Sequence, residues 1–218
     1  MGTSKGYIAP TKPEWSNAKR AVSAYLRDRD SESKSKAIQR FAEAMNSSGR
    51  TAFQPFSSAA GRILSFAQSA SKHGLDGALS SFDRDDLIGK DPKYILGELI
   101  NQFTNNAATM DDSLSADALS QAFDNLNVET IDDLKSIDLD ILLREMVTEF
   151  ININFDLRFE EKIGRGRTAN EKDSIVEEMH EYIADVIHDA LTQHELGKID
   201  LNNLNASTIV IDTLNDAF

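Results

Sequence analysis

The sequence predicts an all-α protein, an irregular multi-helix bundle that follows a flexible N-terminal tail. Two observations predict this fold class. Apolar residues recur at spacings of three and four, the period of one helix face, in most segments after residue 13. The polar breaks between these segments carry helix-capping residues and glycines. We expect roughly nine or ten helices and no internal repeat.

Length and composition limit the class of protein. The 218 residues suffice for one sizeable core with appendages or for two small domains. The absence of cysteine excludes disulfides, thiolate zinc sites and a cysteine nucleophile, as is typical of a reducing compartment. No apolar run approaches the roughly 20 residues that span a bilayer, and the chain opens without a signal-peptide core. The sequence therefore predicts a soluble, cytoplasmic protein without a membrane partner.

Charge is unevenly distributed along the chain. The formal net charge is −13, but residues 1–82 hold 12 Lys and Arg against 6 Asp and Glu. The remainder holds 11 against 30. A basic N-terminal third and an acidic body predict separate surfaces for separate partners.

Three parts follow from these patterns. Residues 1–13 hold two of the four prolines and no apolar period, so they predict a flexible tail. Residues 14–50 predict a basic hairpin of two helices, separated by a polar break at residues 30–33 and closed by Gly49. Residues 51–218 predict an acidic helical domain.

The first half of the acidic domain reads as four helices. Residues 51–73 form an apolar segment rich in small residues, Gly74 closes it, and a short helix follows. Asp91 and Pro92 have the order of an N-cap and a first helical residue. Ser115 is the expected cap of the helix after that.

The second half contains one ambiguous stretch. Residues 139–161 predict a helix, but between 151 and 159 apolar and polar residues alternate strictly, as in a strand. A lone strand would have no partner, so we predict helix there. Thr168 and Glu171 have capping-box spacing and open a helix to about residue 196. A last helix is expected from Ser207.

Two acid–histidine pairs could suggest a metal site. Glu177 with His180, and Asp185 with His188, each have a spacing of three residues. Di-iron bundles carry such Glu-x-x-His pairs on two different helices. Here both pairs lie on one helix, about 12 Å apart at 1.5 Å per residue, so a solvated polar face is favoured over a metal site.

Other chemistry is weakly indicated. No phosphate-binding Gly-rich loop ending in Lys-Ser or Lys-Thr occurs, nor any arrangement of a nucleophile with a base. The basic loop at residues 164–167, with Arg158 and Lys162, could contact phosphate or RNA, but its acidic surroundings oppose this. We predict no catalytic residue, metal or cofactor. The basic N-terminal third is the better electrostatic candidate, for an acidic partner or a nucleic acid.

The opening residues are the strongest candidate site. Methionine aminopeptidase removes Met1 when the next residue is small, which would leave a free amine on Gly2 at the end of the tail. N-myristoylation requires Ser or Thr at the sixth position, where this chain has Gly6, so a lipid tether is disfavoured. An ordinary frayed terminus is the alternative.

The sequence also resembles a known family. The similarity lies in Met1-Gly2-Thr3-Ser4 and in the series Ala60-Gly61-Arg62, Gly74-Leu75-Asp76-Gly77-Ala78-Leu79 and Leu87-Ile88-Gly89-Lys90. An amphipathic helix follows this series. These residues resemble the QatB family of the bacterial Qat anti-phage defence system, over the tail and residues 55–125.

The resemblance implies a non-enzymatic helical protein that offers its tail to a QueC-like enzyme, QatC. Such enzymes use ATP to activate a carboxyl group on a deazapurine and join it to an amine. Gly2 would be the modified residue, and the partner-binding tail would comprise Gly2, Thr3, Ser4, Lys5 and Gly6. The ATPase and TatD-like nuclease of the system are further candidate partners. The alternative is a nucleic-acid-binding or scaffolding adaptor that uses the basic N-terminal third.

Overall fold

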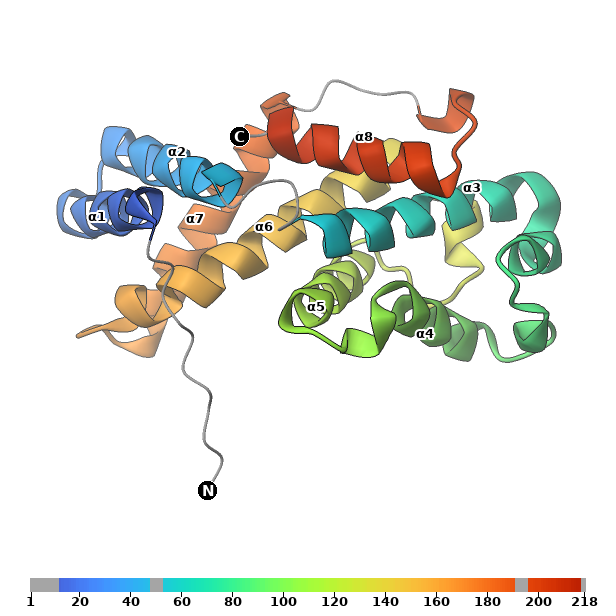
Figure 1. Cartoon of the computed structure of the whole chain (residues 1–218). Coiled ribbons are helices and arrows are strands. Elements are labelled where there is room, and N and C mark those ends of the chain that lie inside the picture. Colours follow the sequence, from blue (N-terminus) through green and yellow to red (C-terminus); the bar gives the residue numbers. More distant parts are fainter. Residues whose placement is uncertain (1–11, 48–52, 191–195, 217–218) are drawn as a thin grey trace. The chain divides into compact units, whose positions relative to one another are not determined.

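The computed structural model describes residues 12–47, 53–190 and 196–216, and no strand occurs among them. The predicted all-α class is therefore confirmed. The chain divides into two units, one within residues 1–49 and the other within residues 50–217. The first unit contains α1 (Pro13–Asp28) and α2 (Ser31–Ser47). The second contains α3 (Gln54–Ser81), α4 (Pro92–Phe103), α5 (Met110–Asn125), α6 (Leu139–Gly164), α7 (Ala169–Ala190) and α8 (Asn203–Asp216), as Figure 1 shows.

The first unit, here called the hairpin, has an apolar core of its own. α1 and α2 lie side by side, and the rings of Trp15 and Phe41 meet edge to face with centroids 6.1 Å apart. Arg29 adopts the left-handed conformation (φ 52°) and its N–H donates to the Tyr25 carbonyl, which ends α1. Asp30 then caps α2 by accepting a hydrogen bond from the Ser33 N–H at 2.7 Å. The chain thus reverses within two residues, and the apolar faces of both helices meet.

The second unit, here called the acidic domain, is organised around α3. α8 packs along one side of α3, while α4 and α5 pack on another (Figure 1). α6 packs between α5 and α7. Phe56 of α3 stacks on Phe150 of α6, with ring centroids 4.1 Å apart, so these two longest helices share the core.

The expected break at Gly74 occurs inside one element. Gly74 has φ 76° and ψ 170°, which is non-helical, and helical structure resumes after it up to Ser81. A positive φ is accessible to glycine at little steric cost. The two helical segments expected on either side of Gly74 are therefore present, and they meet at this kink within α3. With α3 counted as one element, the described residues contain eight α-helices, fewer than the nine or ten expected.

Two predicted N-caps are confirmed. The Asp91 carboxylate accepts hydrogen bonds from the backbone N–H groups of Lys93 and Tyr94, both at 3.1 Å, at the start of α4. The Glu171 carboxylate accepts the Thr168 N–H at 2.8 Å, and the Thr168 hydroxyl accepts the Glu171 N–H at 3.3 Å. Each cap satisfies N–H groups that have no partner within the helix.

The prediction that Ser115 caps α5 is wrong. α5 begins at Met110, and its capping box is formed by Thr109 and Asp112, whose side chains each accept the other's backbone N–H at 3.1 Å. Ser115 is buried within the helix, where its hydroxyl donates to the Asp111 carbonyl at 2.7 Å. A serine that satisfies its own hydroxyl in this way no longer signals a helix start.

The ambiguous stretch of residues 151–161 is helical throughout, as predicted. Asp138 caps α6 by accepting the N–H groups of Asp140 and Ile141 at 2.9 and 3.1 Å. α6 packs against both α5 and α7, so it buries apolar residues on more than one face. A helix buried on several faces has no single apolar stripe. Alternation of apolar and polar residues along part of such a helix therefore does not indicate a strand.

The last helix begins earlier than expected. α8 starts at Asn203 rather than Ser207, after a reciprocal pair of bonds in which Asn202 and Asn205 each accept the other's N–H, at 2.7 and 3.1 Å. The preceding helix, expected to reach about residue 196, is described to Ala190. A short 3-10 turn, Leu196–Lys198, follows the undescribed residues 191–195.

The contact between α3 and α8 predicts how a methyl group added at Gly61 changes stability. A Cβ at Gly61 would lie 2.6 Å from the Ser207 backbone nitrogen and 2.9 Å from its Cα, well inside van der Waals contact. We therefore expect Gly61→Ala to lower the free energy of unfolding by about 1–3 kcal/mol through overpacking. Chemical denaturation followed by circular dichroism measures this change.

Gly97→Ala is the matched control. Gly97 lies within α4, and a Cβ there meets nothing within 4 Å. Adding a methyl group at such a helix position stabilises by about 0.5–1 kcal/mol. Equal effects of the two substitutions would show that the contact between Gly61 and Ser207 does not constrain α8.

Candidate functional site

The sequence-predicted site, Gly2 to Gly6, lies outside the residues that the structure describes. The first described residue is Lys12, whose ammonium group donates a hydrogen bond to the Ser47 carbonyl. α1 begins at the next residue, Pro13, and Ser47 is the last residue of α2. The point where the tail joins the fold is therefore the end of the hairpin at which α1 begins and α2 ends.

A basic groove lies between the two helices of the hairpin. Its volume is about 340 Å³. It is lined by Asn17, Arg20, Ala21, Ala24, Lys36 and Arg40. The two alanines supply a small apolar surface, and the three cations come from both helices. We call this feature the hairpin groove.

The cations of the hairpin groove are only partly neutralised. Arg20 is exposed and donates to the Ser16 carbonyl at 3.3 Å and to Asn17 Oδ1 at 3.2 Å, both uncharged acceptors on its own helix. Arg40 pairs with Glu43, one turn along α2. Lys36 is exposed and forms no ion pair with any described residue. Two of the three cations can therefore receive carboxylates from outside the hairpin.

The basic loop after α6 does not form an anion site in the described structure. Arg165 is 3.3 Å from Glu161, and Arg167 donates to the Ile163 carbonyl at 2.8 Å, so both contact the C-terminal end of α6. Arg158 is half-buried, and burial lowers its pKa to about 10.

The acid–histidine pairs of α7 do not form a metal site. His180 Nε2 lies 2.9 Å from Asp156 Oδ1 of α6, while Asp185 and His188 are exposed. Within the described parts of the chain, no three Asp, Glu or His side chains are placed to hold a metal ion. The same parts contain no helix long and apolar enough to cross a membrane.

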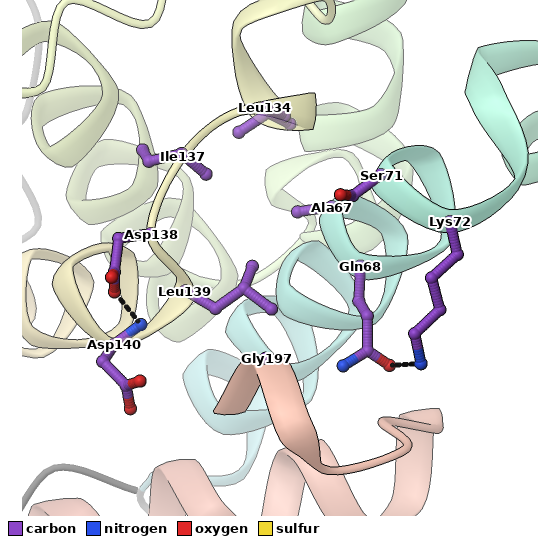
Figure 2. Close-up of a pocket in the computed structure, with 10 residues that line it drawn as sticks. All are labelled: Ala67, Gln68, Ser71, Lys72, Leu134, Ile137, Asp138, Leu139, Asp140 and Gly197. Atoms are coloured by element: carbon purple, nitrogen blue, oxygen red, sulfur yellow. Dashed lines mark hydrogen bonds between the residues drawn. The ribbon is translucent and has the colours of Figure 1, made fainter. Parts of the chain in front are cut away.

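A polar cavity of about 230 Å³ lies within the acidic domain, where α3 faces the start of α6 (Figure 2). Gln68 and Lys72 of α3 line one side, and Asp138 and Asp140 line the other, with Gly197 between them (Figure 2). Sequence reasoning did not identify this cavity. The available signal was Gln68, a long polar residue in the most apolar stretch of α3.

Gln68 holds the chain that leads into α8. Its amide nitrogen donates to the carbonyls of Leu196 and Ile199, at 3.1 and 2.6 Å. Its amide oxygen accepts from the Leu201 N–H at 2.8 Å and from the Lys72 ammonium at 3.0 Å. Because Gln68 is 5 % exposed, these bonds are shielded from water. The polar groups of this cavity therefore serve the fold.

A second polar cluster surrounds Glu149 of α6. Asn125 of α5 donates to Glu145 and to Glu149, at 2.8 and 3.2 Å, and Asn152 donates to Glu149 at 3.3 Å. Burial, and then the charge of Glu145, raise the pKa of Glu149 above its ordinary value. The charge of His180 and the amide hydrogen bonds oppose this rise.

The Gln68 contacts predict a large stability loss on substitution. Gln68→Leu leaves the Leu201 N–H and the carbonyls of Leu196 and Ile199 without that partner. We expect the free energy of unfolding to fall by about 2–3 kcal/mol, measured by denaturant titration. Gln39→Leu, on the exposed face of α2, is the control and should change stability by less than about 0.5 kcal/mol. A loss no larger than that of the control would contradict the role of Gln68.

The Glu149 cluster predicts a pH-dependent stability. A carboxyl whose pKa is raised in the folded state binds its proton more tightly there than in the unfolded chain, so its ionised form lowers stability. Glu149→Gln should therefore raise the Tm at neutral pH. The difference should shrink as the pH falls through the raised pKa of Glu149. Glu181→Gln, on the exposed face of α7, controls for the loss of one negative charge. A Glu149→Gln variant that melts below the parent chain at neutral pH would contradict this reading.

Comparison with known proteins places the chain in a family. No curated protein and no solved structure matches it. A model of the family described as "Qat anti-phage system associated protein QatB" matches residues 39–218. The match includes the second half of α2 and the whole acidic domain, so it extends further toward the C-terminus than the residues that carried the resemblance. It does not include the tail. Because it spans well over half of the sequence, the chain belongs to the QatB family of Qat anti-phage system proteins.

Proposed function

We propose that this chain is an accessory protein of the Qat system that presents its N-terminal tail to the QueC-like enzyme QatC and is modified by it at Gly2. Membership of the QatB family carries the proposal, because it makes the chain a component of an anti-phage system. The chain then acts as a protein substrate rather than as a catalyst. The ATPase and the TatD-like nuclease of the system would then bind the modified protein.

The chemistry of Gly2 suits this role. Glycine has no side chain, so its amine can enter a narrow channel that excludes other residues. An α-amine has a pKa of about 7.7–8.0, and a useful fraction is neutral and nucleophilic near neutral pH. The amine nitrogen forms an amide bond with the carboxyl carbon that ATP has activated. The activating group leaves with its electron pair, and the amine loses one proton.

The length of the tail sets how deep a site it can enter. Ten residue-to-residue steps lead from Gly2 to Lys12, where the chain joins the hairpin. A chain rises at most about 3.3–3.6 Å per residue, so Gly2 can reach no further than roughly 33–36 Å from that point. Thr3 and Ser4 would enter the channel behind Gly2, followed by Lys5 and Gly6.

Mass spectrometry tests the proposal. The protein expressed with QatC should show a mass increment on the N-terminal peptide, confined to Gly2. The protein expressed alone should show none. Gly2→Pro, which replaces the primary amine by a hindered secondary one, should abolish the increment, as should a short extension before Gly2.

The Gly97→Ala variant serves as a control, because it leaves the tail intact and should be modified like the parent chain. An unmodified Gly2 in the presence of active QatC would overturn the proposal. So would a modified product from the extended variant.

A further inference from the structure

The hairpin groove combines an apolar floor with unneutralised cations. Ala21 and Ala24 can accept an aliphatic side chain, while Arg20 and Lys36 face solvent without a carboxylate partner among the described residues. The groove lies wholly within the hairpin, where residues 12–47 hold 8 Lys and Arg against 5 Asp and Glu. It is therefore a basic surface on an otherwise strongly acidic chain.

The chemistry of the groove favours protein over nucleic acid. Sequence-independent binding of single strands uses exposed aromatic rings on which bases stack. The aromatic residues of α1 and α2, Trp15, Tyr25 and Phe41, are each at most 2 % exposed and belong to the hairpin core. A segment with carboxylates and a small aliphatic side chain fits both the rim and the floor.

The groove is also close to the tail along the chain. Asn17 and Arg20 lie five and eight residues beyond Lys12 in the same helix, about 7.5 and 12 Å along its axis. These distances are short compared with the reach of the tail. An enzyme that holds Gly2 in its active site can therefore also reach the groove with its surface.

We propose that the hairpin groove is a docking surface for a carboxylate-rich segment on the surface of the enzyme that receives the tail. This inference rests on the proposed function and names the second contact of the same partner. Two-point attachment raises the effective concentration of Gly2 at the active site without any change at the tail itself. The groove then determines KM, and the tail determines the chemical step.

A charge-reversal pair tests the docking surface. Arg20→Glu/Lys36→Glu should weaken the affinity of the full chain for QatC by at least about tenfold, because each replaced cation becomes a repulsive charge. KM for Gly2 modification should rise by a similar factor while kcat stays constant. A peptide of residues 2–13, which lacks the groove, should be modified with the high KM of this variant.

Arg27→Glu/Arg29→Glu is the matched control. It makes the same change in net charge on the same hairpin, at exposed arginines that do not line the groove. It should retain the parent affinity and KM. Circular dichroism and thermal melting of both variants verify that the hairpin remains folded.

The outcomes separate this inference from the proposed function. Parent-like affinity and KM in Arg20→Glu/Lys36→Glu, with Gly2 still modified, would overturn docking and leave the proposed function intact. Groove-dependent binding without any modification of Gly2 would support docking and overturn the proposed function. Equal losses in both variants would reduce the effect to net charge and overturn docking. Loss of binding to a single-stranded oligothymidine, with QatC binding unchanged, would make the groove a nucleic-acid site instead.

Discussion

The close approach of α3 and α8 is the contact on which much of the acidic domain depends. At Gly61 the two helices approach so closely that a methyl group would overlap the backbone of Ser207. Gln68, two turns further along α3, then binds the chain just before α8 through three backbone groups. α3 thus positions α8 in two ways: by close packing at Gly61 and by the hydrogen bonds of Gln68.

The two units of the chain differ in how they use charge. In the acidic domain, Arg158 is half-buried, and Arg165 and Arg167 bond to the C-terminal end of α6. In the hairpin, Arg20 and Lys36 face solvent. Surface cations that bind only neutral neighbours keep most of their capacity to attract an acidic partner, and salt screens that attraction. The basic residues of the acidic domain therefore stabilise the fold, whereas those of the hairpin groove remain available for a partner.

The sequence predicted best where one local rule determined the structure. The caps at Asp91 and Thr168 and the break at Gly74 depend on a few neighbouring residues, and the structure has all three. Ser115 was misread because its hydroxyl bonds inside the helix, while Thr109 and Asp112 supplied the real capping box.

The features that sequence reasoning missed depend on distant contacts. Gln68 bonds to residues more than 120 positions away, and no local pattern contains that information. The Glu149 cluster joins α5 and α6 in the same way. The hairpin groove was anticipated only as a basic region. Its shape required the pairing of α1 with α2, and the predicted tail site lies outside the described residues.

The bond between Lys12 and the Ser47 carbonyl fixes where the tail ends and the hairpin begins. Insertions or deletions before Lys12 would leave both hairpin helices, and hence their folding energy, untouched. Each residue added or removed would change the reach of Gly2 by up to about 3.3–3.6 Å. Under the proposed function, relatives would adapt to enzymes with deeper or shallower active sites by changing tail length alone. Evolution of partner fit would then be uncoupled from evolution of the fold.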